Sequence, residues 1–147
     1  MDDGKARLKK IIQSIQAFNV NILMPIGERG LIFTLSHQNE LRKHVKITPL
    51  PDKKSLDIVR DKWLLNEFCI EHNLPATRSV LVQQKNGILE RLSDFSYPLL
   101  LKPRIGEGGI GIYFLRSEKE LRNTLRDKMD YFNKEGYILQ EYIEGSE

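Results

Sequence analysis

Residues 99–112 read LLLKPRIGEGGIGI, and this stretch decides how the rest of the chain is interpreted. A short apolar run ends at Lys102, four glycines fall within six residues, and a second apolar run begins at Ile112. Glycine has no Cβ and adopts positive φ at little cost, so backbone N–H groups in such a segment can approach a ligand closely. We therefore predict two strands joined by a loop that can surround phosphate groups.

Three other phosphate-binding patterns do not fit this order. Gly106, Gly108 and Gly111 match G-x-G-x-x-G, but in a dinucleotide-binding fold that motif opens a helix, whereas here it precedes a strand. A Walker A loop needs a Lys-Ser/Thr pair after its last glycine, and none follows. In a protein-kinase loop the phosphate lysine lies after the glycines, whereas Lys102 lies before them. The order of lysine, glycine loop and strand is therefore a separate pattern.

Short helices and strands are predicted on both sides of this loop. The alternation of helix and strand in the first 50 residues favours a parallel α/β layer. Ser117, with Glu120 three residues later, predicts a capping box at the start of the last helix. The predicted elements are helices over 5–18, 28–44, 55–72, 89–95 and 118–134, a buried strand over 20–24, and strands over 45–47, 79–82, 98–102, 112–115 and 137–140.

The loop and the last residues of the chain together resemble the ATP-grasp superfamily, in particular ligases related to carbamoyl-phosphate synthetase and biotin carboxylase. In that family a lysine in a P-[hydrophobic]₃-K-P pattern contacts the nucleotide phosphates, and a glycine-rich loop between antiparallel strands closes over them. The resemblance implies this phosphate role for Lys102. It implies the closing loop for four glycines, Gly106, Gly108, Gly109 and Gly111.

The final residues resemble the family's hinge, Q-E-[hydrophobic]-[hydrophobic]-x-G-x-E. The resemblance implies that the backbone of Glu141, Tyr142 and Ile143 meets the adenine, and that Glu147 accepts hydrogen bonds from the ribose hydroxyls. Asp61-Lys62 resembles a further family pattern at a helix start, and it implies that Lys62 is a second lysine on the phosphate side.

The resemblance also implies an α/β architecture in two parts. Residues 1–54 would be an incomplete preATP-grasp layer, and residues 55–147 would be the first ATP-grasp subdomain, an α+β unit with an antiparallel sheet, up to the hinge. We expect a fragment that is inactive alone, because the second subdomain, with the magnesium ligands, would follow Glu147. The implied cofactors are ATP and Mg²⁺.

The function that this resemblance implies is the ATP-binding portion of a carboxylate–amine ligase that forms an acyl phosphate. Its partners would be ATP or ADP, a small carboxylate and an amine-type acceptor. The alternative is a non-catalytic nucleotide-binding module with a regulatory or assembly role. Faces that a missing half would cover predict self-association into a homo-oligomer.

Plainer interpretations of the same residues stay open. Lys102 could be a strand-end lysine that reaches solvent, and the glycine segment a hairpin turn without a ligand. Lys62 by itself reads as a charge at a helix start, and acidic residues near a chain end are commonly solvated. Arg104 either contacts phosphate or substrate, or keeps the loop soluble.

Composition narrows the class of protein. The chain has 147 residues, 40% hydrophobic and 29% charged, with one cysteine and three histidines. These numbers favour an ordinary domain without a signal peptide, disulfide, zinc spacing or membrane segment, and we expect a reducing, cytoplasmic location. The net charge is only +3, and the sequence has no dense basic stripe of the kind that a nucleic-acid-binding protein needs. Only the pI near 9.0 supports nucleic-acid binding.

Overall fold

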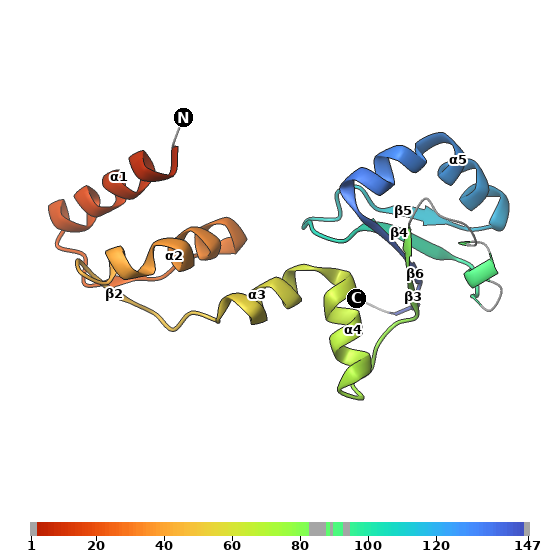
Figure 1. The fold of residues 1–147 in the computed structure, drawn as a ribbon, viewed down its shortest axis with the longest axis horizontal. Coiled ribbons are helices and arrows are strands. Elements are labelled where there is room, and N and C mark those ends of the chain that lie inside the picture. The colour runs from red at the N-terminus through yellow and green to blue at the C-terminus, as the bar shows by residue number, and fades with distance from the viewer. Residues whose placement is uncertain (1–2, 83–87, 89, 93–94, 146–147) are drawn as a thin grey trace. The chain divides into compact units, whose positions relative to one another are not determined.

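A computed structural model describes residues 3–82, 88, 90–92 and 95–145 of the chain. They fall into two compact units, Met1–Lys53 and Lys54–Glu147. No helix in these ranges is both long and apolar enough to cross a membrane. The elements of Figure 1 are α1 (Asp3–Ala17), β1 (Ile22–Leu23), α2 (Gly27–Leu41), β2 (Lys46–Ile47), α3 (Lys53–Arg60), α4 (Lys62–Glu71), β3 (Ser79–Val82), η1 (Glu90–Leu92), β4 (Leu99–Pro103), β5 (Tyr113–Leu115), α5 (Glu118–Glu135) and β6 (Tyr137–Glu141).

The first unit contains the predicted parallel α/β layer. Strands β1 and β2 pair in parallel, with α2 between them in the chain. The strand predicted over 20–24 is wrong in length and in burial, because β1 has two residues and the side chains of Ile22 and Met24 are exposed. Within the described part of the chain β1 pairs with β2 alone, so one of its edges has no partner strand. The buried core residues are Ile15, Leu41, Val45 and Ile47.

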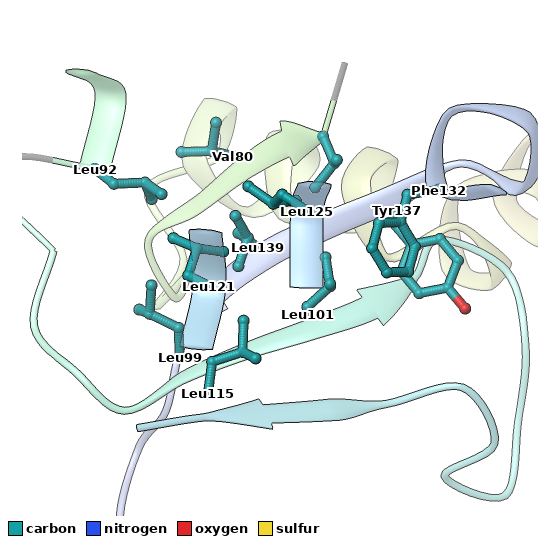
Figure 2. Packing of buried hydrophobic residues seen from close by; sticks show 11 residues of the cluster. Val80, Leu92, Leu99, Leu101, Leu115, Leu121, Leu125, Phe132, Tyr137 and Leu139 are labelled. Carbon is teal, nitrogen blue, oxygen red and sulfur yellow. The ribbon is translucent and has the colours of Figure 1, made fainter. Parts of the chain in front are cut away.

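The second unit is built on a four-stranded antiparallel sheet in the order β3-β6-β4-β5. Figure 2 shows leucines of α5 packed over the strands, and the rings of Phe132 and Tyr137 in contact at one end, with centroids 4.7 Å apart. With the parallel layer of the first unit, this sheet confirms the predicted α/β fold class. The buried cluster is Val80, Val82, Leu92, Leu99, Leu101, Leu115, Leu121, Leu125, Phe132, Tyr137 and Leu139.

Strand β4 presents Lys102 on the face of the sheet away from α5. Leu99 and Leu101 are fully buried in the cluster beneath α5. Successive side chains of a strand point to opposite faces, so Leu100 and Lys102 lie on the other face. The sheet therefore separates the apolar core from the side that carries the charged residue.

Helix α5 begins and ends close to the predicted positions. The Ser117 hydroxyl oxygen accepts the N–H of Glu120 at 3.3 Å, which confirms one half of the capping box. The returning bond differs, because the Glu120 carboxylate accepts the N–H of Arg116 at 2.8 Å instead of that of Ser117. The helix ends at Glu135, and the next residue, Gly136, caps it with φ 72°. Glycine suits this position because it has no Cβ and adopts positive φ at little cost.

The single helix predicted over 55–72 is wrong, because Asp61 divides it into α3 and α4. Asp61 has an extended backbone, with φ −97° and ψ 110°, and its carboxylate caps the first turn of α4. The start of a helix at Asp61-Lys62 agrees with the resemblance that the sequence suggested. The helix predicted over 89–95 is a single 3-10 turn over Glu90–Leu92 in the residues described, and residues 89, 93 and 94 lie outside them.

Candidate functional site

The segment between β4 and β5 contains the four predicted glycines, all with positive φ. The angles are 148° at Gly106, 69° at Gly108, 73° at Gly109 and 78° at Gly111. Residues that carry a Cβ rarely adopt such angles. At Gly111 space is lacking as well, because a Cβ would lie 2.8 Å from the hydroxyl oxygen of Tyr137. The path of the loop therefore depends on glycine, most strictly at Gly111.

A hollow of about 270 Å³ lies between this loop and the start of α4. Its lining includes Lys62, Pro103, Ile112 and loop residues 106–110. This volume is just below the roughly 300 Å³ at which sites for small molecules begin. The hollow can therefore hold part of a ligand, such as a chain of phosphates.

One lysine lines the hollow, and a second lies on the strand that leads into the loop. Lys62 lines it, and its Nζ donates a hydrogen bond of 2.9 Å to the carbonyl oxygen of Gly106. Lys102 is not among the lining residues, but burial and the positive charge of Lys62 lower the pKa of its ammonium group. An anion near both ammonium groups would offset this burial and repulsion. The two lysines are therefore suited to bind an anion together.

Asp61 and Arg104 join the start of α4 to the end of β4. The Arg104 Nε donates to both carboxylate oxygens of Asp61 at 3.1 Å, and its Nη2 donates at 2.6 Å. Asp61 Oδ1 also accepts the backbone N–H groups of Trp63 and Leu64, at 2.9 and 3.3 Å. Burial raises the pKa of this carboxyl, but the hydrogen bonds outweigh burial, so its pKa lies below the usual range.

Sequence reasoning missed this ion pair. It assigned Arg104 to a ligand or to solvent, whereas the structure pairs the guanidinium with a carboxylate 43 residues earlier in the chain. The sequence held only a weak sign of this pair, which is the acidic residue Asp61 directly before Lys62 at a helix start. Nothing local to Asp61 identifies Arg104 as its partner.

The residues expected to form the hinge surround a second hollow, of about 280 Å³. Glu141, Tyr142 and Ile143 line it together with residues 76–78, which precede β3, and residues 96 and 97, which precede β4. It has no lining residue in common with the hollow beside the glycine loop. The expected site residues that line a hollow therefore fall into two groups, whereas Lys102 and Gly111 line neither hollow. Glu147 lies outside the described residues.

Hydrogen bonds within the protein fix the Glu141 side chain and two backbone N–H groups of the hinge. The Glu141 carboxylate accepts the N–H of Ser96 at 3.3 Å and pairs with the guanidinium of Arg78 at 3.4 Å. The backbone N–H of Glu141 donates to the Arg78 carbonyl, and that of Tyr142 to the Pro98 carbonyl. A ligand at the hinge would thus be contacted through other atoms, such as carbonyl oxygens or residue 143.

Comparison with curated proteins finds relatives that each match this chain over part of their length. No protein-family model matches the chain. The D-alanine--D-alanine ligase of Pediococcus pentosaceus is 30% identical over 121 residues, which is 82% of this chain and 32% of that protein. The chain spans about a third or less of the length of the curated relatives that it matches.

Solved structures show the same fold. The biotin carboxylase domain of the 2-oxoglutarate carboxylase from Hydrogenobacter thermophilus, solved with MgADP, ADP and bicarbonate, matches with a TM-score of 0.68 and 20% identity, over 92% of this chain and 31% of that one. The RimK domain protein ATP-grasp from Sphaerobacter thermophilus matches with a TM-score of 0.54 and 11% identity, over 71% of this chain and 39% of that one.

Proposed function

We infer that the chain belongs to the ATP-grasp superfamily, and we propose that it is the ATP-binding portion of a larger ligase that joins a carboxylate to an amine or a similar nucleophile. The observation that carries the proposal is that Lys62 and the glycine loop line one hollow and that Lys62 Nζ donates a hydrogen bond to the loop. Lys102 lies on the strand that leads into this loop, and the positive charge of Lys62 helps to lower the pKa of its ammonium group. These segments lie about 40 residues apart in the chain, and the fold brings them together next to a surface that can accept an anion.

Charge neutralisation is the role we propose for this group. The phosphates of ATP carry several negative charges, and preorganised ammonium and backbone N–H groups stabilise such charge strongly where water is partly excluded. Lys62 and Lys102 would supply the ammonium groups. The four glycines of residues 106–111 would supply backbone N–H groups that have no side chain of their own to shield them.

The hinge would hold the other end of the nucleotide. We propose that adenine contacts the backbone of residues 141–143, and that the Glu147 carboxylate accepts hydrogen bonds from the ribose hydroxyls. Since the N–H groups of Glu141 and Tyr142 are already bonded, Ile143 and carbonyl oxygens would make the adenine contacts. The fixed carboxylate of Glu141 supports a preformed hinge.

The proposed reaction proceeds through an acyl phosphate. A carboxylate oxygen attacks the terminal phosphorus of ATP, and the bond between that phosphorus and the bridging oxygen breaks, so ADP leaves. The amine nitrogen then attacks the acyl carbon, phosphate departs with the bonding electrons, and the nitrogen loses a proton. In this scheme the chain binds ATP and orients its phosphates.

Magnesium does not fit the residues that the structure describes. Phosphoryl transfer from ATP ordinarily uses this ion. Within the described ranges no group of three His, Cys, Asp or Glu side chains is placed to hold a metal. We therefore assign no step to the ion here.

Isothermal titration of this chain with ADP tests the proposal, with Lys102→Ala as the variant and Lys119→Ala on the exposed side of α5 as the control. We expect saturable binding that Lys102→Ala weakens at least about tenfold, or 1.4 kcal/mol, and that Lys119→Ala leaves unchanged. Equal binding by wild type and Lys102→Ala, or no binding by wild type at millimolar ADP, would reject the phosphate role.

A further inference from the structure

We infer that Asp61 and Arg104 are positioning residues, whose ion pair holds the ammonium group of Lys62 at the phosphate hollow. The inference rests on the proposed function for the identity of the ligand. Its geometric basis is independent of that function, because it concerns how two segments of the ligand-free protein are joined.

Each residue of the ion pair lies close in sequence to one of the two lysines. Asp61 directly precedes Lys62, and Arg104 follows Lys102 by two residues. The guanidinium bridges both carboxylate oxygens, an arrangement that fixes orientation as well as distance. Asp61 is almost fully buried, with 6% of its surface exposed, so water competes little for these bonds.

Two further bonds join the same segments. The backbone N–H of Lys62 donates to the carbonyl oxygen of Arg104 at 2.9 Å, and Lys62 Nζ reaches the Gly106 carbonyl. Arg104 is itself held from the other side, because its N–H donates to the Gly136 carbonyl at 2.9 Å. The first residues of α4 and the start of the loop are therefore joined by the ion pair and by two hydrogen bonds from Lys62.

Electrostatics alone predicts the opposite effect of Asp61 on phosphate binding. A carboxylate this close to the hollow repels an anionic ligand, so removing its charge should tighten binding if charge were its only influence. If Asp61 instead fixes Lys62 through Arg104 and the first turn of α4, removing its charge should weaken binding. The sign of the change therefore distinguishes the two roles.

Asp61→Asn is the matched variant. Asparagine is as good an N-cap as aspartate, so the first turn of α4 keeps its cap while the carboxylate charge is lost. Arg104→Lys is the second variant, because a lysine keeps the charge but cannot bridge both oxygens. Asp127→Asn is the control, since Asp127 forms an exposed ion pair with Arg126 on α5.

The first measurement is ADP affinity by calorimetry, in the wild type and in a Lys62→Met background. We expect Asp61→Asn and Arg104→Lys each to weaken ADP binding about tenfold. In the Lys62→Met background the same changes should alter affinity less than about twofold, because a residue that acts through Lys62 has no effect once Lys62 is gone. Tighter binding, or equal losses in both backgrounds, would overturn the inference.

The second measurement needs no nucleotide, so it decides the inference even if ADP does not bind and the proposed function fails. The pKa of the Lys102 ammonium is followed by ¹⁵N NMR titration of the lysine side chains. If Asp61→Asn releases Lys62, the repulsion on Lys102 falls and its pKa rises. Loss of a nearby negative charge alone would lower that pKa. An unchanged or lower value would overturn the inference, whereas Asp127→Asn should have no effect.

Discussion

Lys62 Nζ donates a hydrogen bond to the carbonyl oxygen of Gly106, 44 residues later in the chain and 2.9 Å away. The ammonium group is thus shared between the loop and any anion that enters the hollow beside it. In the ligand-free protein it holds the first glycine of the loop. A bound phosphate would compete with that carbonyl for the same donor.

Replacing Lys62 with Met should loosen the loop. The bond to Gly106 is exposed to solvent, so we expect its loss to cost about 1 kcal/mol locally, or roughly fivefold faster amide exchange over residues 106–111. Hydrogen–deuterium exchange with mass spectrometry measures this. Lys119→Met is the control, and unchanged exchange in Lys62→Met would show that the bond does not hold the loop.

Replacing Lys102 with Met should stabilise the ligand-free protein. Burial and Lys62 lower the pKa of Lys102, so between its folded and unfolded pKa values the unfolded chain binds more protons and stability rises with pH. At neutral pH the charged lysine therefore costs stability, which a methionine avoids. We expect a melting temperature higher by roughly 2–5 °C in thermal denaturation, together with weaker ADP binding. A lower melting temperature would contradict this.

Two glycines of the loop form a matched pair of variants. A Cβ at Gly108 meets no atom within 4 Å, whereas at Gly111 it approaches the Tyr137 hydroxyl, and both residues have similar positive φ. We expect Gly108→Ala to cost about 1 kcal/mol and Gly111→Ala about 2–4 kcal/mol in urea denaturation. Tyr137→Phe should recover part of the second loss, and equal costs at the two positions would reject the contact as the cause.

Acid should weaken the second unit through Asp61. Its pKa is lowered in the folded protein, so the stabilisation is present above the ordinary aspartate value and is lost as pH falls below about 4 through the folded pKa. Urea denaturation between pH 3 and 7 should therefore show a smaller slope with pH for Asp61→Asn than for the wild type. Asp127→Asn should retain the wild-type slope.

The local pattern of the sequence was enough to predict the loop and its strands. Lys102, the four glycines and the apolar runs on either side are neighbours in the chain, so spacing and residue type carry the information. The same holds for α5, where Ser117 and Glu120 mark the start of the helix. These features depend on interactions over a few residues, which a sequence displays directly.

The break at Asp61 could not be predicted from periodicity. Apolar residues recur at helical spacing on both sides of it, so a single helix over 55–72 fitted the pattern. The competing influence is tertiary, because Asp61 is held by Arg104 and extends the backbone at that point. The exposed Ile22 and Met24 are a similar case, since a short apolar run predicts burial only if another element covers it.

The order of strands in the second unit has a consequence for how this sheet is assembled. Strand β6 is central, yet among the described strands it is the last to be synthesised, and β3 pairs with it alone. On a ribosome, β4 and β5 can form their hairpin early, while β3 waits for a partner some 60 residues away. Such distant pairing carries a large loop-closure entropy and slows folding. Completion of the sheet, and with it a settled position for the lysine of β4, therefore depends on the arrival of residues 137–141.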